Sequence, residues 1–120
     1  WTKDMPHRTI AGGNPFFDAD FLKASARRNR IMWDFARRII DLHSIVYAHL
    51  LRRNIVPPVQ NRKTDITVDW ILAYVGLPEE PKPHIGIVGA KMEAEAFSRL
   101  IYGKSLLSEY AQFPIPEYLL

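Results

Sequence analysis

The sequence predicts a mainly α-helical protein built around one long central helix, over about residues 18–53. The stretch from Asp18 to Arg53 contains neither glycine nor proline, and its apolar residues recur at steps of three and four. Its thirty-six residues would span about 54 Å at 1.5 Å per residue. The helical patterns that follow are shorter and are interrupted by glycine and proline. We therefore expect a shorter helical C-terminal half.

The predicted long helix has signals at both ends. Asp18 can cap its first turn, and Arg52 and Arg53 suit the carbonyl groups of its last turn. Asn54 can adopt the left-handed conformation that ends helices, and Pro57 prevents continuation. On the polar face we expect weak i,i+4 ion pairs of Arg30 with Asp34, Asp34 with Arg38, and Arg37 with Asp41.

We divide the chain into an extended N-terminal arm over 1–17, a single helical domain over 18–112 and an extended C-terminal tail over 113–120. Glycines and prolines interrupt the arm, and Pro114 and Pro116 hold the tail extended. Both ends carry large apolar side chains, which favours docking onto a neighbouring surface. The alternative for the arm is that it folds back on the long helix.

Shorter elements are expected in the C-terminal half, where glycines mark the helix ends. Prolines separate the first of these helices from the next. The expected elements are a helix from Thr64 or Asp65 to Gly76, a buried turn over His84–Gly89, a helix over about Ala90 to Tyr102 ended by Gly103, and a short helix from Ser105 to about Ala111.

The glycine-containing string IGIVGAKM, which starts at Ile85, resembles two nucleic-acid or nucleotide motifs. It is similar to the first strand and phosphate turn of Rossmann domains, but the second and third motif glycines fall on Lys91 and Ala94. It also resembles the I-G-x-x-G loop of KH RNA-binding domains, with Ile87 and Val88 where polar residues would suit phosphates. We interpret these glycines as close-packing positions instead.

The apolar face of the long helix is too broad for one neighbouring helix to cover, so we expect it to pack against other proteins. Apolar residues of the tail are expected to join these contacts. The predicted partner-packing residues are Met32, Trp33, Phe35, Ile39, Leu42, Val46, Phe113, Tyr118 and Leu119.

Composition indicates a folded protein, and its charges are unevenly distributed along the chain. Hydrophobic residues make up 48% of the chain, which is too many for a disordered tail, and cysteine is absent. Residues 1–63 carry twelve Lys/Arg against five acids, whereas 64–120 carry four against eight. The chain starts at Trp1, which we interpret as the result of presequence removal in mitochondria; the alternative is that Trp1 marks the edge of a fragment.

No motif in the sequence indicates catalysis, so we expect no enzyme activity, no cofactor, no metal and no small-molecule substrate. The four histidines are scattered, and His43 and His49 would lie on different faces of a helix. The most apolar run, Ile39–Leu51, is too short and too charged for us to expect a membrane span.

These features predict a non-catalytic structural or accessory subunit of a large multi-protein complex, which we expect in mitochondria. The alternative is an RNA-contacting protein of a ribosome-like particle, because arginines recur along the N-terminal half and guanidinium groups suit phosphate oxygens. The possible phosphate contacts are Arg27, Arg28, Arg37, Arg38, Arg52 and Arg53.

Overall fold

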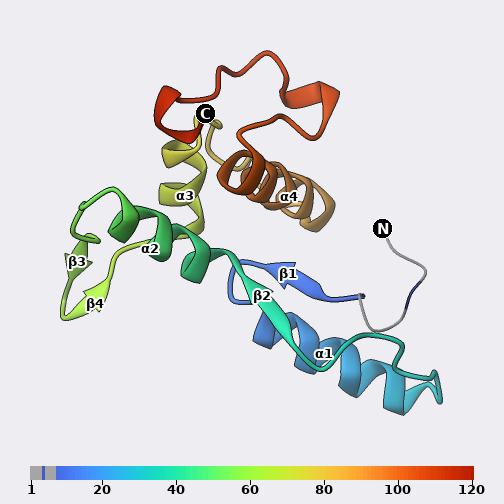
Figure 1. Ribbon diagram of the computed structural model, residues 1–120. Helices are drawn as coiled ribbons and strands as arrows, with labels where there is room; N and C mark the ends of the chain where they lie inside the picture. The colour runs from blue at the N-terminus through green and yellow to red at the C-terminus, as the bar shows by residue number, and fades with distance from the viewer. Residues whose placement is uncertain (1–3, 5–7) are drawn as a thin grey trace. The chain divides into compact units, whose positions relative to one another are not determined.

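The computed structural model describes Asp4 and residues 8–120 (Figure 1). The chain forms two compact units, unit 1 over Trp1–Leu42 and unit 2 over His43–Leu120. About half of the described residues are helical, and the remainder includes a few short strands. The protein is therefore a small mixed α/β fold. The predicted helical character is seen only in part, in helices that make up about half of the fold.

The prediction of a single helix over 18–53 is wrong. Helix α1 (Pro15–Arg28) and helix α2 (Leu42–Arg52) occupy that stretch, separated by irregular backbone and by strand β2 (Ile39–Asp41). The predicted i,i+4 ion pairs lose their helical spacing as a result. Asp34 pairs instead with Arg8, and Asp41 Oδ1 accepts a hydrogen bond of 3.3 Å from the backbone N–H of Asn14.

Helix α1 ends early because the backbone turns into the left-handed region at Arg30, where φ is +55°. The N–H of Ile31 donates to the carbonyl of Ala26 at 2.8 Å, and the N–H of Arg30 donates to that of Arg27 at 3.2 Å. This pair of bonds is a Schellman motif, in which glycine usually occupies the position of Arg30. The sequence prediction missed the helix end because no glycine or proline marks it.

Unit 1 is a β-α-β arrangement. Strand β1 (Ile10–Gly12) pairs in parallel with β2, in the register Ile10↔Ile39, Ala11↔Ile40 and Gly12↔Asp41. Helix α1 connects the two strands and packs against both (Figure 1). Its buried residues are Pro15 and Ala19, one turn apart. Of the predicted extended arm over 1–17, residues 1–3 and 5–7 lie outside the described residues; the rest contains β1 and the first turn of α1.

Helix α2 retains the C-terminal part of the apolar pattern that was predicted for the long helix. Leu42, Val46 and Leu50 follow one another at steps of four and are almost fully buried. The helix ends at Arg52, and Asn54 just beyond it adopts the predicted left-handed conformation, with φ at +56°. The N–H of Ile55 donates to the carbonyl of Leu50 at 2.9 Å. Asparagine tolerates this conformation, so the end could be read from the sequence.

A short hairpin and helix α3 follow. Strands β3 (Val59–Gln60) and β4 (Lys63–Thr64) pair antiparallel in the stretch predicted as a linker. Helix α3 (Val68–Tyr74) starts later than expected, because Thr67 is its cap and accepts a bond of 3.1 Å from the N–H of Trp70. Its predicted end at Gly76 is confirmed, with φ at +76°.

Helix α4 (Gly86–Tyr102) includes most of the stretch predicted as a buried turn over His84–Gly89. That prediction is wrong, since Ile85 and Ile87 are exposed and the glycines lie in or next to the first turn of the helix. The two glycine-motif resemblances therefore do not correspond to loops. Gly103 ends the helix as expected.

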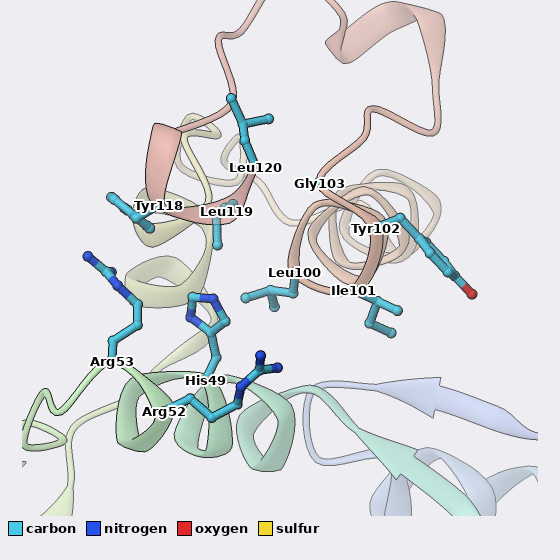
Figure 2. Close-up of a pocket in the computed structure, with 10 residues that line it drawn as sticks. All are labelled: His49, Arg52, Arg53, Leu100, Ile101, Tyr102, Gly103, Tyr118, Leu119 and Leu120. Carbon is cyan, nitrogen blue, oxygen red and sulfur yellow. The ribbon is translucent and has the colours of Figure 1, made fainter.

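The C-terminal segment folds back onto unit 2. A 3₁₀ turn, η2 (Ser108–Tyr110), replaces the predicted short helix, and a second turn, η3 (Glu117–Leu119), forms in the tail. The hydroxyl of Tyr118 donates to the carbonyl of Tyr74 at 2.6 Å, and the Arg53 guanidinium lies over the Tyr118 ring (Figure 2). Leu119 is buried. The tail thus docks within its own chain.

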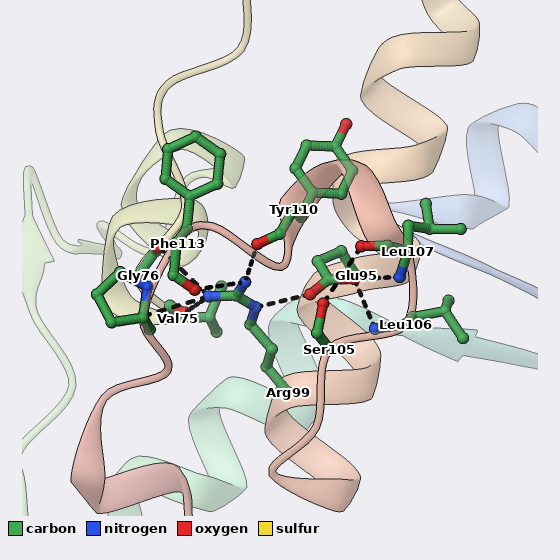
Figure 3. A network of polar contacts seen from close by, with 10 residues as sticks. Val75, Gly76, Glu95, Arg99, Ser105, Leu106, Leu107, Tyr110 and Phe113 are labelled. Carbon is green, nitrogen blue, oxygen red and sulfur yellow. Dashed lines mark hydrogen bonds and ion pairs between the residues drawn. The ribbon is translucent and has the colours of Figure 1, made fainter.

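A buried ion pair holds this segment in place (Figure 3). Arg99 and Glu95, both on α4, are fully buried, and Arg99 Nε lies 2.8 Å from Glu95 Oε1. The other carboxylate oxygen of Glu95 accepts bonds from the N–H groups of Leu106 and Leu107 at 2.8 and 2.9 Å. The terminal nitrogens of Arg99 donate to the carbonyls of Val75, Gly76, Tyr110, Phe113 and Pro114.

Candidate functional site

The first candidate site is the exposed apolar side chains of helix α1 in unit 1, here called the α1 face. Phe17 and Phe21 lie on one side of the helix, and Phe16 and Leu22 lie further round it in either direction. The three phenylalanines are each about two thirds exposed, at 66, 63 and 65%. The rings of Phe17 and Phe21, one turn apart on the helix, lie 4.7 Å between centroids. Large apolar groups gathered in this way on a small protein are typical of an interaction site.

Basic residues adjoin the α1 face. A hollow of about 500 Å³ is lined by Phe16, Arg37, Arg38 and Ile39, so two arginines lie beside an exposed phenylalanine. Arg27 and Arg28 lie in the last turn of α1. Among the described residues, no ion pair engages any of these four arginines. The surface therefore combines apolar groups with cations that have no acidic partner in the described part of the chain.

The structure spreads the predicted partner-packing residues over different environments. Met32 is 83% exposed, whereas Trp33 and Phe35 are half-buried and pack on each other with ring centroids 5.1 Å apart. Ile39, in β2, and Phe113, whose carbonyl accepts from Arg99, are half-buried, and Tyr118 is exposed on one side. The remaining three, Leu42, Val46 and Leu119, are buried inside the chain itself.

The predicted phosphate-contacting arginines do not form one helical track. Arg27 and Arg28 end α1, and Arg37 and Arg38 lie in the irregular segment before β2. Arg52 is the last residue of α2 in unit 2, and Arg53 follows it. Only the first two pairs belong to the same unit. The RNA hypothesis assumed that these arginines lie along one continuous helix, and the structure does not contain that helix.

The second candidate site is a pocket of about 430 Å³ within unit 2 (Figure 2). The last turn of α2 supplies one side of it, the end of α4 a second side, and the tail a third. The pocket-lining residues are His49, Arg52, Arg53, Leu100, Ile101, Tyr102, Gly103, Tyr118, Leu119 and Leu120.

Polar contacts fix the α2 side of this pocket. Arg53 Nη1 donates to the hydroxyl of Tyr74 at 2.8 Å, and His49 Nδ1 lies 3.0 Å from the same oxygen. Burial, followed by repulsion from the Arg53 and Arg52 guanidinium groups, lowers the pKa of His49 below its ordinary value. Neutral His49 can accept the Tyr74 O–H at Nδ1, which leaves Nε2–H as a donor.

Sequence analysis named His49, Arg52 and Arg53 but did not combine them into a site. Their i, i+3, i+4 spacing places them on one side of a helix, and this was the available signal. The other sides of the pocket could not be predicted, because Tyr74, Tyr118 and the end of α4 are distant in sequence from His49, Arg52 and Arg53. Phe21 and Leu22 were also missed, since the long-helix prediction assigned them no distinct surface.

Comparison of the chain with protein-family models, with curated proteins and with solved structures gives no match. Among the residues that the structure describes, none of the helices has the length and apolar character needed to cross a membrane. Within the same residues, no three side chains of the metal-ligating types come together. The functional argument therefore depends on the two surfaces themselves.

Proposed function

We propose that this protein is a non-catalytic structural subunit of a large protein assembly, and that the α1 face docks on a neighbouring protein. One observation carries the proposal: Phe16, Phe17 and Phe21 expose about two thirds of their surface on one short helix. Covering a phenylalanine side chain contributes roughly 1.5–3 kcal/mol. Three such side chains give a partner a substantial gain on docking.

The charges next to the α1 face favour a particular kind of partner. Arg37 and Arg38 line the hollow beside Phe16, and no carboxylate pairs with them in the described part of the chain. An apolar protein surface bordered by aspartate or glutamate would supply both the missing contacts and the missing charges. Asp18 in the first turn of α1 and Asp20 in the next turn give the helix an acidic end, which helps to fix the orientation of the partner.

The proposal is tested with the tagged full-length chain in the cells that make it. After gentle lysis we expect the wild type to sediment well above its own mass of 13.9 kDa, with or without ribonuclease treatment. The double variant Phe17→Ser/Phe21→Ser should sediment mostly as a small species, because the α1 face is lost. A matched control, Leu51→Ser/Leu106→Ser, replaces two leucines of unit 2 that are each somewhat more than half exposed. This variant should sediment like the wild type.

Three results would contradict this function. If the wild type sediments as the isolated chain, or if the phenylalanine variant stays in the large particle, the α1 face is not a docking surface. If ribonuclease alone releases the wild type, the RNA-contacting alternative replaces the proposal, and release should then also increase steeply with salt. A mitochondrial location stays a prediction from the sequence.

A further inference from the structure

The pocket of unit 2 is independent of the α1 face and has a different chemistry. Three nitrogen-bearing side chains line one side: His49 and Arg52 from the last turn of α2, and Arg53 directly after it. None of the ten lining side chains is acidic. Leu100, Ile101 and Leu119 contribute apolar surface from α4 and the tail. The pocket therefore combines cations with an apolar wall.

The cations of the pocket are held in place without being neutralised. Arg53 lies over the ring of Tyr118, with its guanidinium carbon 4.1 Å from the ring centroid, and it also donates to the Tyr74 hydroxyl. In the described residues, no ion pair joins a carboxylate to Arg52 or Arg53. Stacking on an aromatic ring limits the motion of Arg53 and leaves its positive charge uncompensated.

We propose that this pocket binds a small organic anion, whose carboxylate or phosphate group pairs with Arg52 and Arg53 and whose apolar body lies against Leu100, Ile101 and Leu119. Figure 2 shows the His49 ring between the side chains of the two arginines, at the C-terminal end of α2. Guanidinium groups bind carboxylate and phosphate oxygens in a forked geometry, and the Nε2–H of neutral His49 adds a further donor. A volume of about 430 Å³ lies within the range of small-molecule sites.

The test is calorimetric titration of the full chain with three probes: octanoate, octyl phosphate and inorganic phosphate. We expect at least one amphiphilic probe to bind with a dissociation constant of about 1 mM or tighter. Inorganic phosphate should bind at least tenfold more weakly, because it cannot use the apolar wall. The stronger of the two amphiphilic probes identifies the anionic group that the pocket prefers.

Variants then locate the binding. Arg52→Gln should weaken the amphiphilic probe at least tenfold, and Arg52 is exposed, so its replacement should leave the fold intact by circular dichroism. Arg62→Gln, in the β3–β4 turn, removes the same charge from unit 2 and should bind like the wild type. Ile101→Ser should weaken the amphiphiles while leaving inorganic phosphate unchanged.

Three results would overturn the proposal. The first is the absence of saturable binding by either amphiphile. The second is unchanged affinity in Arg52→Gln. The third is equal weakening in Arg62→Gln, which would indicate attraction to net charge rather than to the pocket. Because all of these variants lie outside unit 1, failure here leaves the sedimentation test of the α1 face unaffected.

Discussion

At the scale of single residues, Arg99 is the clearest case of a group whose role depends on its surroundings. Its side chain is fully buried, and it meets Glu95 and five backbone carbonyls (Figure 3). A charge in the interior is tolerated only when it is paired and hydrogen-bonded. Arg99 therefore connects α4 to the end of α3 and to the C-terminal segment, and each of these depends on it.

Replacing Arg99 with methionine should strongly destabilise unit 2. The buried carboxylate of Glu95 would lose its cation, and breaking a buried pair in this way typically costs about 3–5 kcal/mol. Urea denaturation followed by circular dichroism measures the change. The control is Lys91→Ala, which removes an exposed pair with Glu109 of 3.3 Å and should change stability by less than about 1 kcal/mol. Similar effects of the two variants would mean that the Arg99 network adds little.

The pH dependence of stability should also report on Glu95. Burial acts to raise the pKa of this carboxyl, but the Arg99 side chain, the N–H groups of Leu107 and Leu106 and the Ser105 hydroxyl outweigh it, so the pKa lies below the ordinary value of 4.5. The charged form stabilises the folded state above pH 4.5, and this contribution is lost as the pH falls through the lowered folded-state pKa.

Glu95→Gln cannot undergo this titration. It should be less stable than the wild type at pH 7, and the difference between the two proteins should shrink as the pH falls below 4.5. Denaturation midpoints at a series of pH values between 7 and 3 provide the measurement. A difference that stays constant over this series would show that Glu95 is not charged in the fold.

Neither the burial of Glu95 nor that of Arg99 could be predicted from the sequence. An i,i+4 acid–base pair on a helix is most often exposed. The carbonyls that accept from Arg99 belong to residues 11 to 24 positions away in the chain, so only the tertiary fold brings them together.

At the scale of the elements, helix ends could be predicted where the sequence marks them. Asn54, Gly76 and Gly103 adopt left-handed conformations at or just beyond the ends of α2, α3 and α4, as their residue types indicate. Arg30 adopts the same conformation at the end of α1 without such a mark. Because this end carries no sequence signal, the prediction joined two helices into one. The expected line of arginines and the expected i,i+4 ion pairs depended on that single helix and were wrong for the same reason.

Gly76 and Gly86 offer a matched test of what a glycine contributes. A Cβ at Gly76 would lie 2.6 Å from the carbonyl oxygen of Pro114 and 2.9 Å from Cδ of Pro116, and φ there is +76°. Gly76→Ala should therefore destabilise the protein by about 1–3 kcal/mol. At Gly86 nothing lies within 4 Å, so Gly86→Ala should stabilise it by about 0.4–1 kcal/mol.

Thermal denaturation of these two alanine variants beside the wild type distinguishes the roles of the glycines. A loss of stability in both would indicate that helix α4 starts with a conformation that alanine disfavours. An unchanged midpoint for Gly76→Ala would mean that the tail does not press against the end of α3.

At the scale of the whole molecule, the division into two units changes how the charge is distributed. From the sequence, Trp1–Leu42 carries eight Lys/Arg and five acids, whereas His43–Leu120 carries eight of each. The excess positive charge of the chain therefore belongs to unit 1, which also bears the α1 face. The sequence comparison of 1–63 with 64–120 indicated an asymmetry, but it placed the boundary inside the β3–β4 hairpin.

Removal of residues 113–120 tests whether the tail belongs to the fold of unit 2. The deletion removes the Phe113 and Pro114 carbonyls that accept from Arg99, and the buried side chain of Leu119. Unsatisfied buried donors cost about 1–3 kcal/mol each, so we expect a clear loss of stability in urea denaturation. Unchanged stability would support the sequence prediction instead, in which the tail is available to other proteins.

The Arg99 network has a further consequence for the order of events during synthesis. The last residue of unit 1, Leu42, is synthesised 72 residues before Pro114, the last acceptor of Arg99. At about 5–20 residues per second, this interval lasts about 4–14 s. The nascent chain therefore presents the phenylalanines of α1 to the cell well before unit 2 can close around its buried charge.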